Sequence, residues 1–128
     1  MNNLNIAPTK TTPGVVFDPV QKILEFSGQS YPENAHRFYQ GIQQTMDSYL
    51  AQNTEPLMVN FKLDYFNTSS SKCVLDLMEC LEKYHKLHNN ITITWYYLED
   101  DEDMHDSGYD FSLDIAIPFK LVPYNPEN

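Results

Sequence analysis

Apolar residues recur along the chain with two spacings, which predict short strands and two helices. The clearest strand is expected at 57–66, where alternate residues face opposite sides of a sheet. One side carries Leu57, Val59, Phe61, Leu63 and Tyr65, and the other carries Asn60, Lys62 and Asp64. Shorter β-type runs are expected at 4–6, 15–17, 23–26, 91–97 and 111–117. Asp18-Pro19 predicts a hairpin turn, and Pro118 is expected to end the last strand.

Spacings of three and four residues predict the two helices. The first is expected to begin at Ser30, because Ser30 and Glu33 have the spacing of a capping box and Pro32 is tolerated in a first helical turn. Its apolar stripe consists of Ala35, Phe38, Tyr39, Ile42, Met46, Tyr49 and Leu50. The second helix is expected to follow the polar run 67–71 and to end at Asn89-Asn90. Its apolar face consists of Val74, Leu77, Met78, Leu81 and Tyr84.

Strands that alternate with helices predict an α/β fold. We expect a single domain over residues 1–128, with one mixed β-sheet and two main helices packed on it. The strand–helix–strand unit 57–97 predicts a right-handed crossover between two parallel strands. Residues 1–3 and 123–128 are expected to form flexible tails.

The charge of the chain is strongly negative and unevenly distributed. The sequence has 8 Lys and Arg against 18 Asp and Glu, a net charge of −10, and 12 of the acidic residues lie in 65–128. Such a surface repels phosphate backbones and anionic lipid headgroups, so neither nucleic acid nor a membrane is expected as a partner.

Hydropathy and cysteine use predict a cytoplasmic protein. No apolar run approaches the ~18 residues that span a bilayer, and the first residues lack the basic and apolar segments of a secretory signal. Cys73 and Cys80 stand seven residues apart on the second expected helix. That separation is too long for a disulfide bond and is typical of buried, reduced thiols.

The run Asn67–Lys72 lies where a strand is expected to pass into a helix. The first N–H groups of a helix lack partners within it, and Thr68, Ser69 or Ser70 is expected to cap them. Four consecutive hydroxyl residues exceed what a cap requires, and Lys72 follows Thr68 by one helical turn. An anion on Thr68 would meet free N–H groups, the positive end of the helix dipole and the Lys72 ammonium group. The residue types alone favour the cap, and a phosphorylation site stays open beside it.

An acidic run from Glu99 to Asp110 holds seven carboxylates. It lacks the glycine and the ligand spacing of a calcium-binding helix–loop–helix, so a solvated surface is favoured over a metal site. Four of its residues are also expected to form a docking surface for a basic partner: Asp100, Asp101, Glu102 and Asp103.

No catalytic constellation is found in the sequence, so neither an enzyme nor a cofactor is expected. His85 and His88 lack a second pair of ligands that would complete a zinc site, so surface or half-buried histidines are expected there. There is no Gly-x-Ser-x-Gly motif and no phosphate-binding glycine loop, and the chain has 4 glycines in all. Two other functions stay open: a metal-binding domain or hydrolase that uses the acidic run, and an acidic inhibitor of a basic partner.

Six short motifs follow one another along the chain. They are Thr12-Pro13, Gly28 with Ser30-Tyr31-Pro32-Glu33, Phe38-Tyr39, Tyr65-Phe66-Asn67-Thr68-Ser69-Ser70-Ser71-Lys72, Trp95-Tyr96-Tyr97 and Asp100-Asp101-Glu102-Asp103-Met104. Together they resemble the SiaC family of bacterial regulatory phosphoproteins, from about Leu4 to Phe119. The most specific part is the motif from Tyr65 to Lys72 followed by the Trp-Tyr-Tyr strand and the acidic run.

This resemblance implies a fold similar to STAS-type anti-sigma-factor antagonists and a role in partner switching. It implies phosphorylation of Thr68 by a dedicated protein kinase and dephosphorylation by a metal-dependent serine/threonine phosphatase. The unphosphorylated form would bind and activate a diguanylate cyclase, which raises cyclic di-GMP and favours aggregation and biofilm. The residues around the phosphosite, expected also to bind the partner, are Asn67, Ser69, Ser70, Ser71 and Lys72.

Overall fold

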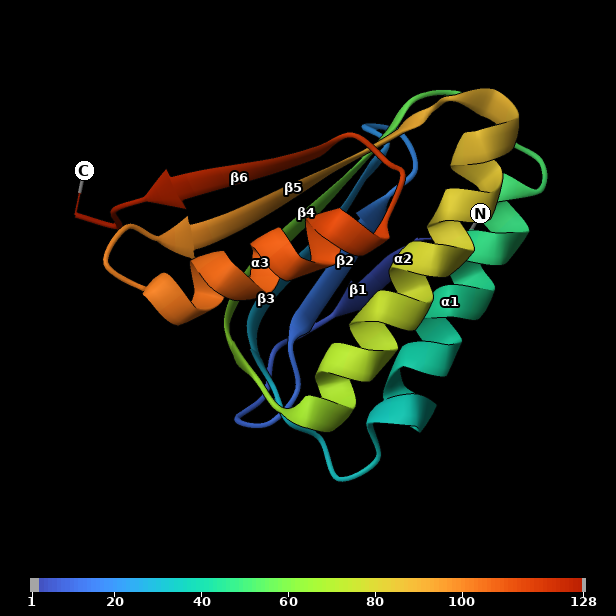
Figure 1. Ribbon diagram of the computed structural model, residues 1–128. Helices are drawn as coiled ribbons and strands as arrows, with labels where there is room; N and C mark the ends of the chain where they lie inside the picture. The colour runs from blue at the N-terminus through green and yellow to red at the C-terminus, as the bar shows by residue number, and fades with distance from the viewer. Residues whose placement is uncertain (1–2, 128) are drawn as a thin grey trace.

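The computed structural model describes residues 3–127, which form one six-stranded sheet and three helices (Figure 1). The strands are β1 (Leu4–Ile6), β2 (Gly14–Asp18), β3 (Ile23–Ser30), β4 (Leu57–Phe66), β5 (Ile91–Leu98) and β6 (Phe119–Tyr124). The helices are α1 (Ala35–Leu50), α2 (Thr68–His88) and α3 (Glu102–Asp114). The expected α/β class with a mixed sheet is confirmed, and the third helix is an addition to it.

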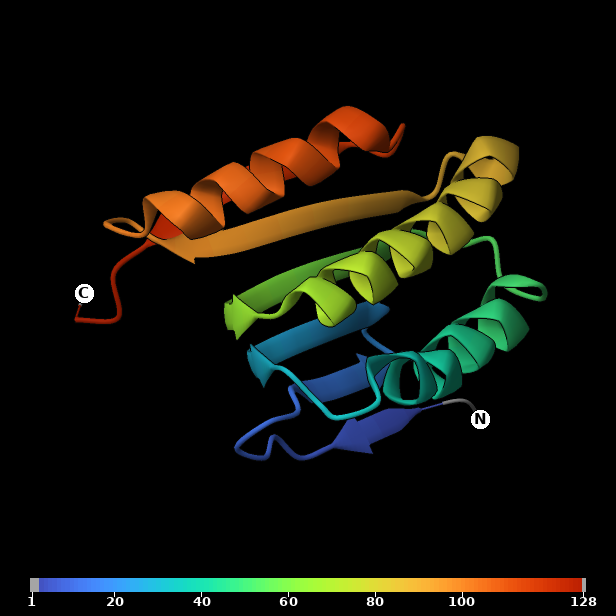
Figure 2. The same cartoon turned by 60° about the horizontal axis from the view of Figure 1, so that its bottom comes forward.

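The strands follow one another across the sheet in chain order. β1–β2 and β2–β3 pair antiparallel, so the expected hairpin is confirmed, whereas β3–β4, β4–β5 and β5–β6 pair parallel. Each parallel pair is joined through one helix, as expected for the unit 57–97. The three helices lie in front of the sheet in Figure 1, on one face. Figure 2 shows α1 and α2 side by side and α3 over β5.

The core lies between the sheet and these helices. β4 contributes Leu57, Val59, Phe61 and Leu63 to it. The Phe61 ring stacks on Phe26 of β3, with 4.8 Å between ring centroids, and its centroid lies 5.5 Å from that of Trp95 in β5. Burial of one such side chain contributes roughly 1.5–3 kcal/mol. The parallel strands therefore carry much of the hydrophobic stabilisation.

A β-bulge interrupts the pairing of β3 with β4. Gly28 lies opposite Leu63 and Gln29 lies opposite Tyr65, so β4 contains one residue more than β3 at this point. Gly28 has φ of 90°, a conformation that residues with a Cβ rarely adopt. Tyr65 was expected on the buried side with Leu63, but it is 51% exposed because the extra residue changes the side that it faces.

The first helix begins later than the sequence indicates, so the capping box at Ser30 is wrong. Ser30 is the last residue of β3, and α1 begins at Ala35 with Asn34 as its cap. The Asn34 side chain accepts a hydrogen bond from the Arg37 amide at 3.0 Å. Tyr31 precedes Pro32, and a residue before proline avoids helical geometry. Pairing with β4 keeps Ser30 extended, so both effects oppose a helix that begins at Ser30.

The strand expected at 111–117 is also wrong. Residues up to Asp114 belong to α3, and the last strand begins after Pro118, which was expected to end it. Helical spacing explains the difference, because Met104, Gly108 and Phe111 form the buried face of α3. Asp101 caps this helix: its side chain accepts from the Met104 amide at 3.0 Å.

The structure differs in part from the tails expected at the two ends of the chain, and it agrees with the expected end of the second helix. Pro123 and Tyr124 belong to β6, so the tail expected at 123–128 is wrong at those positions. Residues 1, 2 and 128 lie outside the described residues. The end of α2 at Asn89 is confirmed, and Asn89 adopts the left-handed conformation with φ of 51°.

Within residues 3–127, none of the helices has the length and hydropathy that crossing a bilayer requires.

Two glycines give a matched test of the packing of α3. A Cβ on Gly108 would lie 2.6 Å from Nε1 of Trp95, whereas a Cβ on Gly41 of α1 would have no neighbour within 4 Å. We expect Gly108→Ala to lower the free energy of unfolding by roughly 1–3 kcal/mol through overpacking. Gly41→Ala should raise it by roughly 0.5–1 kcal/mol through helix propensity. Urea denaturation measures both, and equal effects would contradict the close contact of α3 with Trp95.

Candidate functional site

The segment expected to hold the phosphosite lies at the junction of β4 and α2. Asn67 is the N-cap of α2, and its Oδ1 accepts from the Ser70 amide at 2.9 Å. The Asn67 amide in turn donates to the Ser30 carbonyl at 3.0 Å. A cap formed by Thr68, Ser69 or Ser70 is therefore wrong, since the asparagine before them takes that role.

The four hydroxyl residues of this segment have different surroundings. Thr68 and Ser69 are exposed, Ser71 is half-buried, and Ser70 is fully buried. Ser30 Oγ donates to Ser70 Oγ at 2.8 Å. Because a serine hydroxyl has one proton, the Tyr39 hydroxyl, 2.8 Å from Ser30 Oγ, donates to it. The first turn of α2 thus presents Thr68 and Ser69 to solvent and turns Ser70 inward.

Burial also changes the acidity of this cluster. Tyr39 lies on α1 and is buried against Phe26, and this burial raises the pKa of its hydroxyl to about 12. The hydroxyl therefore stays protonated at neutral pH and keeps its role as donor.

Thr68 and Lys72 lie together in a groove between α2 and α3. The groove has a volume of about 500 Å³ and is lined by Thr68, Ser71, Lys72, Leu75, Ser107, Asp110, Phe111 and Asp114. Within residues 3–127, the exposed Lys72 ammonium group forms no ion pair. Thr68 and Lys72 therefore line the same groove, and the α3 side of the groove, which the sequence did not indicate, adds two carboxylates.

Asp110, the last residue of the acidic run, lines this groove, whereas the four residues expected to dock a basic partner lie apart from it. Asp100, Asp101, Glu102 and Asp103 line a shallow hollow at the start of α3. Glu102 and Asp103 belong to the first turn of that helix, where its dipole favours negative charge. No cluster of three His, Cys, Asp or Glu side chains within residues 3–127 is arranged to hold a metal ion. A local structural role at the start of α3 thus accounts for part of the acidic run.

The histidines that the sequence singled out also have separate surroundings. His85 is buried, and its Nδ1 accepts from the Ile91 amide at 3.1 Å, which joins the end of α2 to β5. His88 is exposed. A surface or half-buried position was expected for each histidine. This prediction is confirmed for His88, whereas His85 is buried.

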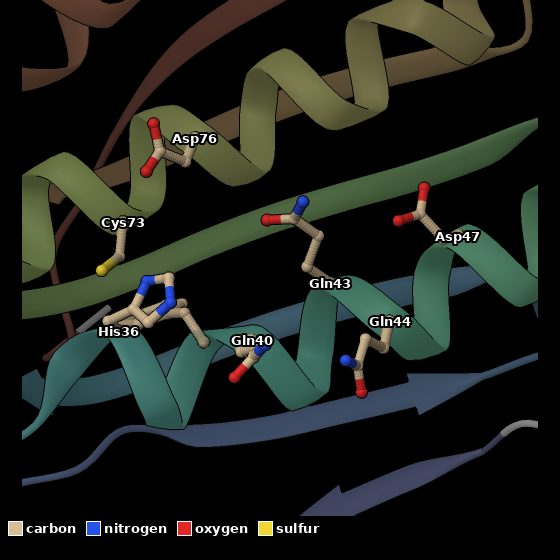
Figure 3. A pocket seen from close by; sticks show the side chains of 8 residues that line it. His36, Gln40, Gln43, Gln44, Asp47, Cys73 and Asp76 are labelled. Atoms are coloured by element: carbon tan, nitrogen blue, oxygen red, sulfur yellow. The ribbon is translucent and has the colours of Figure 1, made fainter.

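A second groove lies between α1 and α2 (Figure 3). His36 and Cys73 face each other across it, with glutamine side chains of α1 along one wall. Cys73 is half-buried and free, and burial raises the pKa of its thiol. Cys80 is also free and is buried; burial, together with Asp47, which accepts its S–H at 3.0 Å, raises the pKa of that thiol to about 12. Both thiols are therefore protonated and poorly nucleophilic at neutral pH.

Comparison with known proteins assigns the chain to a family. The model of a family described as SiaC family regulatory phosphoprotein matches residues 6–124. The chain belongs to the SiaC family. An uncharacterised protein of Pseudomonas aeruginosa strain UCBPP-PA14 is 30% identical over 125 residues, which are 98% of this chain and 99% of that protein. The family expected from the sequence motifs is confirmed.

Solved structures of SiaC from Pseudomonas aeruginosa have the same fold. Apo-SiaC superposes with a TM-score of 0.88 at 30% identity, over 95% of this chain and 99% of that chain. A complex of the diguanylate cyclase SiaD with its activator SiaC matches with a TM-score of 0.90 at 29% identity, over 94% of this chain and 99% of that chain. The fold of this chain is thus that of the solved SiaC structures.

Two alanine variants distinguish the helix cap from the exposed hydroxyl. Asn67→Ala removes the acceptor for the Ser70 amide and is expected to lower the free energy of unfolding by roughly 0.5–2 kcal/mol. Thr68→Ala removes an exposed side chain that caps nothing, so it should change stability by less than about 0.5 kcal/mol. Thermal and urea denaturation measure both. A larger loss in Thr68→Ala than in Asn67→Ala would contradict this assignment of the cap.

Proposed function

We propose that this protein binds and activates a diguanylate cyclase while Thr68 is unphosphorylated, and that phosphorylation of Thr68 blocks the binding. The observation that carries the proposal is the exposed Thr68 hydroxyl on the first turn of α2, at the rim of a groove that also holds Lys72. The SiaC of Pseudomonas aeruginosa, which has the same fold, is the activator of such a cyclase. The protein acts as a regulator and a phosphate acceptor, and the cyclase carries out the synthesis of cyclic di-GMP.

The phosphate cycle requires two further partners. A protein kinase catalyses attack of Thr68 Oγ1 on the γ-phosphorus of ATP. A P–O bond forms to Thr68, the bond to the bridging oxygen of ADP breaks, and the hydroxyl proton passes to a base on the kinase. A metal-dependent serine/threonine phosphatase then hydrolyses the phosphothreonine with water. ATP and GTP are cytoplasmic nucleotides, so we place the cycle in the cytoplasm.

The phosphate acts locally and not through the overall charge. It adds about −1.5 to −2 charges to a protein that already has a net charge of −10. It should not unfold α2, because an anion at a helix N-terminus stabilises the helix by ~0.3–1 kcal/mol. A threonine hydroxyl is easily buried at an interface, whereas an unpaired dianion is not. A penalty of ~3–5 kcal/mol weakens binding by roughly two to four decades.

The test identifies the cyclase first. Each diguanylate cyclase of the source organism is assayed for conversion of GTP to cyclic di-GMP with and without this protein. Stimulation of at least one cyclase by the unphosphorylated protein is the expected result. Stimulation of none overturns the proposal.

The role of Thr68 is tested with that cyclase by calorimetry. Thr68→Ala should bind within about threefold of the wild type, and Thr68→Glu should bind at least ~10-fold more weakly, since a buried carboxylate also lacks a partner. Thr54→Glu places the same charge on an exposed threonine before the other end of β4 and is the matched control; it should bind as the wild type does. Equal affinity of Thr68→Glu and the wild type would show that the cyclase does not cover Thr68.

Lys72 is expected to stabilise the dianionic form of the phosphate. A cation beside phosphothreonine lowers its second pKa, so Lys72→Ala should raise that pKa by roughly 0.3–0.7. Titration of the phosphorylated protein by ³¹P NMR measures the shift. Lys83→Ala removes an exposed lysine from another part of the same helix and should leave the pKa unchanged. An identical titration of the two variants would exclude the contact with Lys72.

A further inference from the structure

Three buried hydroxyl groups meet beneath the first turn of α2. Ser30 ends β3, Tyr39 lies on α1, and Ser70 lies on α2; their exposed fractions are 0%, 3% and 0%. Tyr39 Oη lies 2.8 Å from Ser30 Oγ, and Ser30 Oγ lies 2.8 Å from Ser70 Oγ. Each hydroxyl comes from a different element, so this chain of hydroxyls joins the sheet to both helices at one point.

Ser30 also holds the segment before the helix. Its carbonyl accepts from the Asn67 amide at 3.0 Å, and the Asn67 side chain accepts from the Ser70 amide at 2.9 Å. Ser30 therefore contacts the start of α2 through its backbone and through its side chain. Successive residues of a helix are rotated by about 100°, so a first turn with Ser70 fixed inward has Thr68 on the outer side.

A chain of buried hydroxyls has a directional requirement that an apolar contact lacks. Each member must keep its partner, because an unpaired buried hydroxyl is unfavourable, so the chain favours one orientation of the turn. The Tyr39 ring has packing contacts of its own: it stacks on Phe26 with 6.2 Å between centroids and meets Phe38 edge-on at 5.3 Å. Removal of its hydroxyl alone therefore leaves the ring in place.

We infer that Tyr39 and Ser30 are positioning residues for the phosphosite. Through Ser70 they hold the first turn of α2 in the orientation that presents Thr68 to the cyclase. This inference rests on the proposed function of Thr68. It assigns part of the specificity for the partner to residues that the partner does not touch.

Amide hydrogen exchange of the isolated protein tests the positioning directly. The amides of Ser70 and Ser71 donate to Asn67 in the first turn of α2, where we expect exchange through local opening. A loss of global stability alone would then leave their rates unchanged. Tyr39→Phe should make them exchange about 3- to 10-fold faster. Tyr49→Phe is the matched control, because Tyr49 is a buried tyrosine of the same helix and its hydroxyl forms no hydrogen bond within residues 3–127. Unchanged rates in the first turn, or faster exchange in the central strands alone, would overturn the inference.

The second measurement uses the cyclase identified above. Tyr39→Phe should lower the affinity about 3- to 10-fold and Tyr49→Phe less than twofold. Ser70→Ala breaks the other end of the chain and serves as the second variant; it should give the same local exchange and the same loss of affinity. Faster exchange in the first turn with unchanged affinity would overturn the positioning role. If the wild type stimulates no cyclase, the proposed function fails, and the exchange rates still decide whether the hydroxyl chain holds the turn.

Discussion

The register of β3 on β4 is the constraint on which the site depends. With the bulge beside Gly28, Ser30 lies opposite Phe66, the residue before the cap of α2. Without the extra residue, Ser30 would pair one position earlier, and its side chain and carbonyl would no longer meet Ser70 and Asn67. One extra residue in β4 thus aligns the end of β3 with the beginning of a helix almost 40 residues later.

The parallel part of the sheet could be predicted from the sequence because its strands have strong local patterns. The strands around Val59 and Ile93 are apolar at the expected positions, and the helix between them has an uninterrupted stripe. The last part of the chain was ambiguous, since Phe111, Leu113, Ile115 and Ile117 alternate as in a strand. Leu113 is 67% exposed, so this alternation is accidental, and the helical spacing that begins at Met104 determines the structure.

The site was predictable only where it is local. The spacing of Thr68 and Lys72 is a property of one helix, and the structure places both in one groove. The partnership of Ser30, Tyr39 and Ser70 depends on the sheet register and on how α1 packs, neither of which a local pattern encodes. Ser30 even has the residue type and spacing of a helix cap, so local chemistry pointed to a different role. The carboxylates of α3 were likewise missed as neighbours of Thr68, because the segment that forms this helix was predicted as an acidic run followed by a strand.

The close approach of α3 to the sheet has an optical consequence. Trp95 is the single tryptophan of the sequence; it is 1% exposed, and its Nε1 donates to the Met104 carbonyl of α3 at 3.0 Å. Its indole lies beneath Gly108 and beside the Phe111 ring, which also lines the groove next to Thr68. The tryptophan fluorescence of the protein therefore comes from one dry, hydrogen-bonded indole behind one wall of that groove. Emission from this indole gives a label-free signal of any event that moves α3 away from the sheet.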